Sequence, residues 1–199
     1  MTDAVGSMLK IWLRARAAAA DLVSDCRGLA ATEFAIIVPL MITMFFGTVE
    51  LSSGIAVDRK VTLVARTMSD LASQSISVYD TDLPNFTQMG KAILTPYSAT
   101  PLKFTITELW VDPATLKARV QWSIGSTPYG TPGTVITIPS ALAVANTYLI
   151  MSEVSYQYKA SVPYFSGAGG IPLSDKTYTR PRQSQCVLYN TATGSCPKS

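Results

Sequence analysis

The chain has 199 residues, of which 48% are hydrophobic and 15% are charged, and its formal net charge is +3. This composition excludes a disordered chain, because it supplies enough apolar surface for one membrane segment and one modest domain with its own core. The small and dispersed positive charge excludes the clustered basic surface of a nucleic-acid-binding protein, so we expect no nucleic-acid partner.

Residues 1–28 predict a cytoplasmic leader. They carry four basic residues, Lys10, Arg14, Arg16 and Arg27, and no further Lys or Arg occurs until Arg59. Because Lys and Arg close to an apolar segment favour the cytoplasmic side, we expect the N-terminus in the cytoplasm. The remainder of the chain is then expected on the other side of the membrane.

Residues 29–49 predict a single transmembrane helix. They read LAATEFAIIVPLMITMFFGTV, and a helix of this length spans roughly 30 Å, the hydrocarbon thickness of a bilayer. A secretory signal peptide has a shorter apolar region followed by a small-x-small cleavage site, whereas this run continues into a further helical pattern. We therefore expect a retained membrane anchor rather than a signal that is removed.

Glu33 lies inside this segment and needs an explanation, because a carboxylate at the centre of a bilayer costs about 3 kcal/mol. It follows Leu29 by about one helical turn. From there its side chain can reach the head groups, or it can be protonated. Its position alone therefore does not separate a tolerated residue from a functional one.

The residues around Glu33 resemble a processing site. Arg27 and Gly28 precede the apolar run, and Glu33 and Phe34 are the fifth and sixth residues after the glycine. This pattern resembles the cleavage site of type IV prepilins. The longer stretch resembles more narrowly the TadE-like proteins of the tight-adherence (Tad/Flp) pilus, and it reads GLAATEFAIIVPLMITMFFGTVELS.

The resemblance implies a minor pilin or pseudopilin that a prepilin peptidase cuts between Gly28 and Leu29. It also implies partners among the other Tad pilins and the inner-membrane assembly proteins. The cut creates an α-amino group on Leu29, four residues before Glu33 on one helix face, so the two charges can pair within one chain. In a filament, the resemblance implies that Glu33 neutralises the amine of a neighbouring subunit, because an unpaired charge is costly in lipid.

Pro39 lies inside the predicted membrane helix. It lacks a backbone N–H and frees the carbonyl of Ala35, so we expect a helix kink at this point. A kink without a special role and a local opening of the helix in a filament both agree with the sequence.

An amphipathic stalk helix is predicted over residues 50–73. Its apolar residues recur at intervals near three and four, at Leu51, Ile55, Val61, Val64, Met68 and Leu71. A coiled-coil strip between subunits would use such a stripe, but we favour a stalk that packs on its own domain.

Residues 74–199 predict a small exported domain. A short helix over 83–93, with Asp82 as its N-cap, precedes a change from helical to period-two alternation. Together with the preceding helix, this predicts an α+β, pilin-like fold, in which a long N-terminal transmembrane and stalk helix is followed by a domain with an antiparallel sheet.

The period-two pattern predicts the strands of this domain. Residues 102–124 read as a hairpin with one covered face, and a phase slip at Glu108 and Leu109 predicts a bulge. The further expected elements are an edge strand over 134–138, a long strand over 148–159, a turn at 166–170 and a last strand within 175–189.

The cysteines divide between the two sides of the membrane. Cys26 lies in the leader, whereas Cys186 and Cys196 lie in the exported part, where the compartment is oxidising. A disulfide that closes their short loop is expected to stabilise the domain by about 2–3 kcal/mol. Two free thiols are the alternative.

The sequence favours a structural function over an enzymatic one. It contains no histidine, and the cysteines fall on opposite sides of the membrane segment. We therefore expect no metal site, no cofactor and no Ser–His–Asp or Cys–His machinery.

Three functions remain open at this point. They are a minor pilin of the inner membrane with its C-terminal domain in the periplasm or the pilus, an uncleaved membrane scaffold of the same apparatus, and an adhesive module. The adhesive module would use the aromatic and glycine-rich loops over 126–133 and 163–173.

Overall fold

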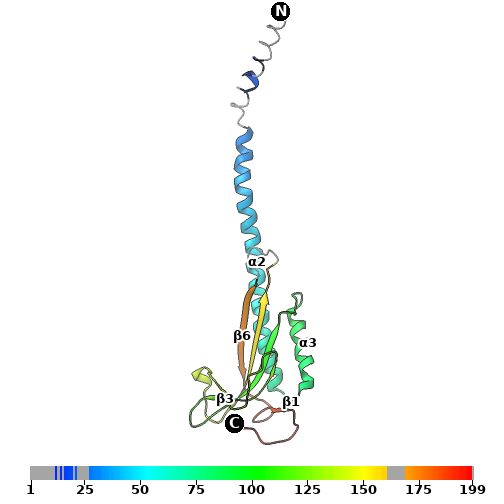
Figure 1. Ribbon diagram of the computed structural model, residues 1–199, viewed down its shortest axis with the longest axis vertical. Coiled ribbons are helices and arrows are strands. Elements are labelled where there is room, and N and C mark those ends of the chain that lie inside the picture. The colour runs from blue at the N-terminus through cyan, green and yellow to red at the C-terminus, as the bar shows by residue number, and fades with distance from the viewer. Residues whose placement is uncertain are drawn as a thin grey trace, which may run out of the picture. The chain divides into compact units, whose positions relative to one another are not determined.

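The computed structural model describes residues 27–160 and 169–198, together with residues 12, 14, 16–19 and 21. It forms two compact units, Met1–Val49 and Glu50–Ser199. A long N-terminal helix is followed by a small domain with an antiparallel sheet (Figure 1), which confirms the predicted α+β fold. Cys26, most of the leader and much of the expected turn over 166–170 lie outside the described residues.

Helix α2 comprises Arg27–Ser73 without interruption. In the second unit its buried face consists of residues at steps of four, three and four, and Val57, Val61, Val64 and Met68 are fully buried there. The expected stalk helix therefore packs on its own domain.

Part of the predicted stalk stripe was wrong. Leu51, Ile55 and Leu71 are 67%, 49% and 41% exposed. Leu71 lies beside the buried stripe, whereas Leu51 and Ile55 lie more than roughly 100° away from Val57 around the helix, because the six-residue step from Ile55 to Val61 is not a helical repeat. Only the middle of the predicted stripe, Val61 to Met68, faces the domain.

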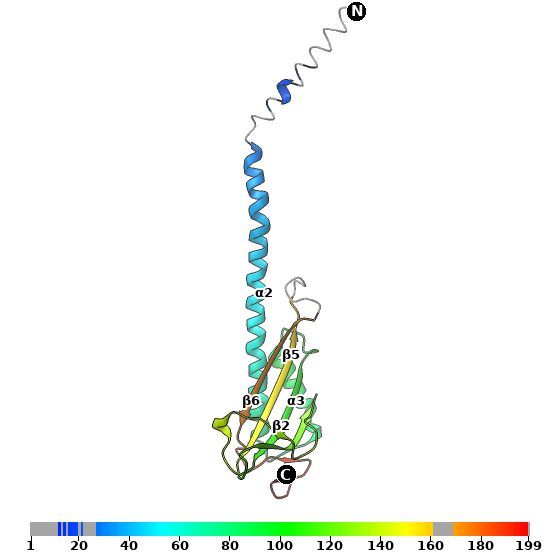
Figure 2. The same ribbon diagram turned by 60° about the vertical axis from the view of Figure 1, so that its left-hand side comes forward.

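The sheet has five strands in the order β4-β3-β2-β5-β6, and every neighbouring pair is antiparallel. The long strands β2, β5 and β6 run beside one another (Figure 2). Strand β6 begins earlier than the strand expected within 175–189, and the edge strand β4 is shorter than the expected 134–138. The bounds are β2 Lys103–Val111, β3 Ala118–Gly125, β4 Val135–Ile136, β5 Tyr148–Tyr158 and β6 Ile171–Thr179.

Helix α3 comprises Leu83–Leu94, with Pro84 in its first turn. Asp82 occupies its N-cap position but makes no capping bond to it. Its carboxylate accepts the N–H of Tyr79 at 2.9 Å instead, and so closes the preceding 3-10 turn η1, Asp80–Asp82. Phe86 and Leu94 are buried and fix α3 to the core.

The main core lies between the two helices and one face of the sheet. The buried stripe of α2 and the apolar side of α3 meet strand residues of alternating position, among them Ile106, Trp122, Ile150 and Val154. The alternation expected for the strands is therefore correct on this face.

The expectation of only one covered face was wrong. Leu109, Val120, Leu149 and Met151 form a second buried cluster on the opposite face. The segment between β3 and β5, which contains β4 and the 3-10 turn η2 (Ser140–Leu142), supplies side chains that cover it. Sequence alternation cannot show this cover, because loop residues with no period provide it.

A β-bulge explains how strand β3 contributes side chains to both hydrophobic clusters. The register between β2 and β3 shifts at Glu108 and Leu109, as predicted. The extra residue is Gln121, since Glu108 pairs with Trp122 and Leu109 pairs with Val120. Leu116, expected as a strand residue, lies instead in the turn with φ 54° and is half exposed.

The C-terminal segment returns to the end of α2. Strand β7, Leu188–Tyr189, pairs in parallel with β1, Ser77–Val78. The ring of Tyr189 stacks on Trp122 with centroids 5.5 Å apart. Cys186 and Cys196 are joined by a disulfide, which confirms the predicted bridge.

Candidate functional site

The apolar part of α2 exposes its side chains around the whole helix. Phe34, Ile36, Leu40, Met41 and Phe45 are each more than 60% exposed. Among the described residues, one helix is long and apolar enough to cross a membrane, and it comprises Ala30–Ser73. A helix that is apolar on all sides requires lipid or other apolar helices around it. The segment therefore fits a membrane anchor.

The sequence-predicted processing and assembly residues lie together at the start of α2. Gly28 and Leu29 belong to its first turn, and Glu33 and Phe34 follow one turn later. A methyl group added at Gly28 would meet no other atom within 4 Å. Glu33 and Phe34 are both exposed on the isolated chain. Gly28, Glu33 and Phe34 are therefore accessible to molecules outside the chain.

The hydroxyl groups of the apolar segment bond within the helix. Thr43 Oγ1 donates to the carbonyl of Pro39 at 2.8 Å, and Thr48 Oγ1 donates to the carbonyl of Met44 at 2.8 Å. Such bonds satisfy polar side chains in a bilayer, where no water replaces them. The helix is continuous through Pro39, and the kink expected there stays a prediction.

Glu50 begins the second unit and is fastened to the end of β5. Its side chain is only 8% exposed, and Tyr158 Oη donates to its Oε2 at 3.1 Å. Burial, and then the bond to Glu50, raise the pKa of Tyr158, so the phenol remains a donor at neutral pH. This contact joins the residue that follows the apolar segment to the sheet.

Strand β5 runs antiparallel to the stalk part of α2. Ser69 Oγ, near the end of α2, donates to the carbonyl of Ile150 at 3.1 Å, near the start of β5. Tyr158, at the end of β5, meets Glu50. The end of the domain that contains Tyr158 is therefore the end next to Glu50, the first residue after the apolar segment.

A buried carboxyl holds the C-terminal segment to the sheet. Glu108 is fully buried, and its Oε1 accepts the N–H of Val187 at 2.6 Å. Trp122 Nε1 donates to the carbonyl of the same Val187 at 2.7 Å. Burial raises the pKa of Glu108 to about 8, so the group is mainly neutral at pH 7. The backbone N–H and C=O of Val187 are thus both hydrogen-bonded to strand side chains, next to disulfide-bonded Cys186.

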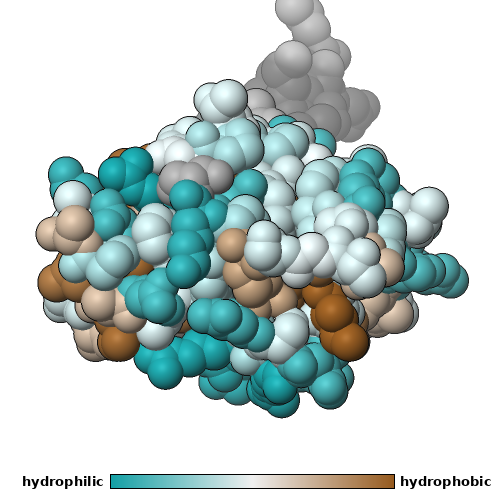
Figure 3. Space-filling view, turned by 90° about the horizontal axis from the view of Figure 1, so that it is seen from below, coloured by the Kyte–Doolittle hydropathy of each residue, from teal (hydrophilic) through white to brown (hydrophobic). Residues whose placement is uncertain are grey.

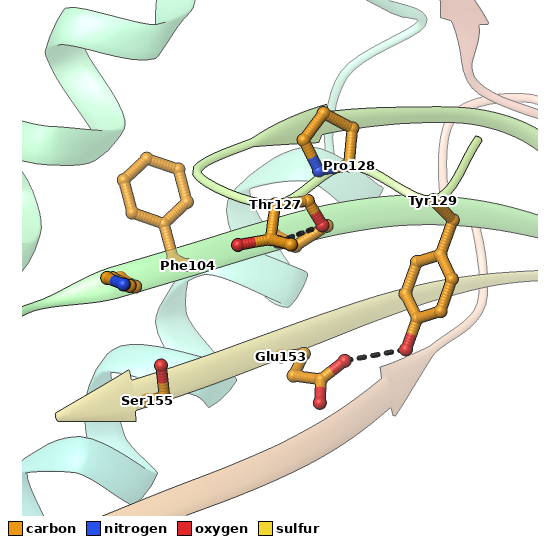
Figure 4. Close-up of a pocket in the computed structure, with 8 residues that line it drawn as sticks. Phe104, Thr127, Pro128, Tyr129, Glu153 and Ser155 are labelled. Carbon is orange, nitrogen blue, oxygen red and sulfur yellow. Dashed lines mark hydrogen bonds between the residues drawn. The ribbon is translucent and has the colours of Figure 1, made fainter.

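A polar pocket of about 350 Å³ opens on the other face of the sheet, beside the loop that follows β3 (Figure 4). Glu153 lies in it and accepts a hydrogen bond from Tyr129 Oη at 2.7 Å. Lys176 Nζ lies 3.0 Å from the same carboxylate, so its charge is neutralised. The pocket includes part of the loop proposed for adhesion, whereas much of the loop over 163–173 lies outside the described residues.

The domain surface at the end near the C-terminus is mainly hydrophilic. Seen from that end, hydrophobic residues are scattered among hydrophilic ones (Figure 3). Scattered apolar residues are normal for a surface in water. This face contrasts with the apolar part of α2.

Comparison with known proteins agrees with this contrast between the apolar part of α2 and the domain. Residues 28–68 match the family model described as TadE-like protein. This segment is TadE-like. The match begins at Gly28, includes the apolar part of α2, and ends in the stalk at Met68. It confirms the resemblance and indicates a protein associated with the Tad pilus. No curated protein and no solved structure matches the chain.

Sequence reasoning missed two residues that organise the site. Glu50 was only the first residue of the predicted stalk, and its partner Tyr158 lies 108 positions away. Glu108 was used only to locate the bulge, although it stands at a core position of the strand alternation. A carboxylate in phase with Phe104 and Ile106 was the available signal.

Proposed function

We propose that this chain is a minor pilin, or pseudopilin, of the Tad pilus, and that it is a structural subunit without enzymatic activity. A prepilin peptidase removes residues 1–28, and residues 29–49 anchor the mature subunit with its N-terminus toward the cytoplasm. The observation that carries the proposal is the TadE-like match on a helix whose apolar side chains are exposed all round.

The exposed helix supports insertion and lateral assembly. Each large apolar side chain transferred from water into an apolar environment contributes about 1.5–3 kcal/mol. Phe34, Ile36 and Phe45 are among those that the chain leaves uncovered. Lipid covers them in the membrane, and helices of other pilins cover them in the assembly. Both environments are apolar, so one segment serves before and after assembly.

Glu33 then acts as the assembly carboxylate. The new amine of Leu29 is a cation at neutral pH, and the first turns of α2 present Glu33 to neighbours. Pairing across two subunits removes two isolated charges from lipid at once. The carboxylate therefore favours one axial position of a subunit against its neighbour.

The N-terminus of the mature protein tests the processing step. Mass spectrometry of protein purified from membranes should show a chain that begins at Leu29. A strain without active prepilin peptidase is the control and should yield the chain from Met1. An intact Met1 in cells with active peptidase would instead support the uncleaved scaffold of the same apparatus.

The Glu33→Gln variant tests the assembly step. Insertion and cleavage should be retained, because the substitution removes an insertion penalty of about 3 kcal/mol. Recovery with pilin partners should fall, since the amine of Leu29 then lacks its counter-ion. Asp58→Asn is the matched control, because Asp58 is an exposed carboxylate later on the same helix. Recovery of Glu33→Gln with its partners at wild-type yield would refute the pairing.

A further inference from the structure

A second pocket lies at the end of the domain that follows the apolar segment. Its volume is about 310 Å³, and its lining includes Tyr97, Ser98, Thr100, Tyr158 and Lys159. It is formed by the loop after α3 on one side and by the end of β5 on the other. No function discussed above uses it.

The Glu50 contact places one wall of this pocket next to the first residue after the apolar segment. Tyr158 lines the pocket and bonds to Glu50, the residue directly after the apolar segment. A methyl group added at Gly54, one turn further along α2, would lie 3.7 Å from the Tyr158 ring. The Tyr158 wall of the pocket therefore lies within about one helical turn of Glu50, the residue at which the predicted span has just ended.

Hydrogen bonds hold both walls of the pocket in place. Tyr156 Oη donates to the carbonyl of Ser98 at 2.7 Å and joins the loop to β5. Lys60 Nζ donates to the carbonyls of Ile93 and Thr95, each at 2.7 Å, at the end of α3. The loop is thus fixed to the sheet and to the stalk, and the pocket is preformed.

The lining suits a phosphate group attached to an apolar molecule. Lys159 is exposed and supplies a cation, and the residues that line the pocket include no carboxylate. Ser98 Oγ donates to Thr100 Oγ1 at 3.2 Å, which leaves the hydroxyl hydrogen of Thr100 for a phosphate oxygen. Tyrosines are enriched at the depth of the head groups, because one end of the ring is apolar and the other polar.

We propose that this pocket binds the head group of an anionic phospholipid, with Lys159 and Thr100 on the phosphate and the Tyr97 ring against the glycerol. The proposal rests on the membrane anchoring in the proposed function. The bound lipid would meet a site whose walls are already bonded to both α2 and β5.

The test uses the full chain in detergent micelles, titrated with phosphatidylglycerol and measured by native mass spectrometry. Wild-type protein should retain one lipid at low concentration. Lys159→Ala should weaken retention about fivefold, the factor that corresponds to the roughly 1 kcal/mol contributed by one basic side chain at an anionic surface. Lys117→Ala, an exposed lysine in the turn between β2 and β3, is the control and should retain the lipid as wild type does.

Two results would overturn the proposal. One is equal retention by wild type and Lys159→Ala, and the other is equal retention of phosphatidylglycerol and the zwitterionic phosphatidylcholine by wild type. Glycerol 3-phosphate, which lacks acyl chains, should not compete at equal concentration, and effective competition would identify a soluble phosphate site instead. The same spectra give the mass of the chain, so a failure of lipid binding is read separately from a failure of cleavage at Gly28.

Discussion

Replacing Glu108 by Gln should change the pH dependence of stability in a defined direction. The substitution keeps an oxygen that accepts the N–H of Val187 and removes the group that titrates. Burial raises the pKa of Glu108 to about 8 in the folded protein, against an ordinary value of 4.5. The folded state therefore holds a proton that the unfolded state has lost between these two pH values.

The sign and size follow from this difference in bound protons. Below pH 4.5 both states are protonated, so the contribution of Glu108 to stability is fully present. As the pH rises toward 8, wild type loses about 1.4 kcal/mol per pH unit. Between pH 5 and pH 8 the wild type should therefore lose about 4 kcal/mol relative to Glu108→Gln.

At low pH the difference in stability between the two proteins is expected to favour wild type. The neutral carboxyl of wild type places one O–H at Oε2, which has no hydrogen-bond partner in the described part of the chain, whereas the amide of Gln places two N–H donors there. A buried donor without a partner costs about 1–3 kcal/mol. The variant should thus be less stable than wild type at pH 5 and more stable at pH 8.

Urea titrations of the full chain in detergent micelles measure this crossing. Tryptophan fluorescence is a suitable signal, because the Trp122 indole bonds to Val187 and stacks on Tyr189. Contributions of other titrating groups cancel in the difference between the two proteins. A difference that stays constant from pH 5 to pH 8 would show that Glu108 is ionised in the folded state and would refute the reasoning.

Three further changes probe the fold. Replacing Cys186 and Cys196 by Ser should lower the unfolding free energy by about 3 kcal/mol, because the bridge closes a short loop. Tyr158→Phe should cost about 1.5–3 kcal/mol in urea unfolding, because it removes a bond to the buried carboxylate of Glu50. Gly125→Ala should cost roughly 3 kcal/mol by the same assay, because φ is +125° and the added methyl group would collide with the β2 backbone.

Each change has a control within the chain. Reduction of wild type should reproduce the unfolding of the serine variant, and a difference between them would argue against the bridge as the cause. Tyr156→Phe removes a bond to the neutral carbonyl of Ser98 and should cost only about 1 kcal/mol. Gly130→Ala meets no atom within 4 Å, and a loss equal to that of Gly125→Ala would contradict the steric explanation.

The helices were the most predictable part of the fold, because local periodicity determines them. The pattern predicted an end near Ser73 for the stalk, and α2 ends there. Which stalk residues are buried was less predictable. Ile55 and Val57 are both apolar, but only Val57 is in helical phase with Val61 and faces the sheet. The predicted stripe included Ile55 although its six-residue step to Val61 is not a helical repeat.

The strands show a limit of prediction from the sequence. Val120 and Trp122 stand two residues apart, which normally places two side chains on one face. The extra residue Gln121 in the bulge sends them to opposite faces and to different cores. The pattern of β2 showed that a bulge exists, but only the pairing of the two strands shows which strand carries the extra residue.

The assembly residues could be predicted from the sequence, whereas the contacts of the buried carboxyl groups could not. Gly28, Leu29, Glu33 and Phe34 form a local motif, and the TadE-like match now covers it, while their roles stay proposals. Glu108 and its partner Val187 are 79 positions apart. No spacing rule describes contacts between such distant positions, so the polar residue could be found in the sequence but its partner could not.

The TadE-like segment and the compact units have different boundaries, and this difference constrains how the chain works. The second unit begins at Glu50, whereas the family match continues to Met68. The matched segment therefore includes Val57, Val61 and Val64, which are buried against the sheet. Such a stripe would be exposed to water if the helix stood alone, so the segment requires a domain that covers it. The sheet can supply that cover with any apolar residues in the right phase, since packing depends on volume and position more than on identity. The match can therefore end in the stalk at Met68, while the sheet that covers the stripe lies outside it.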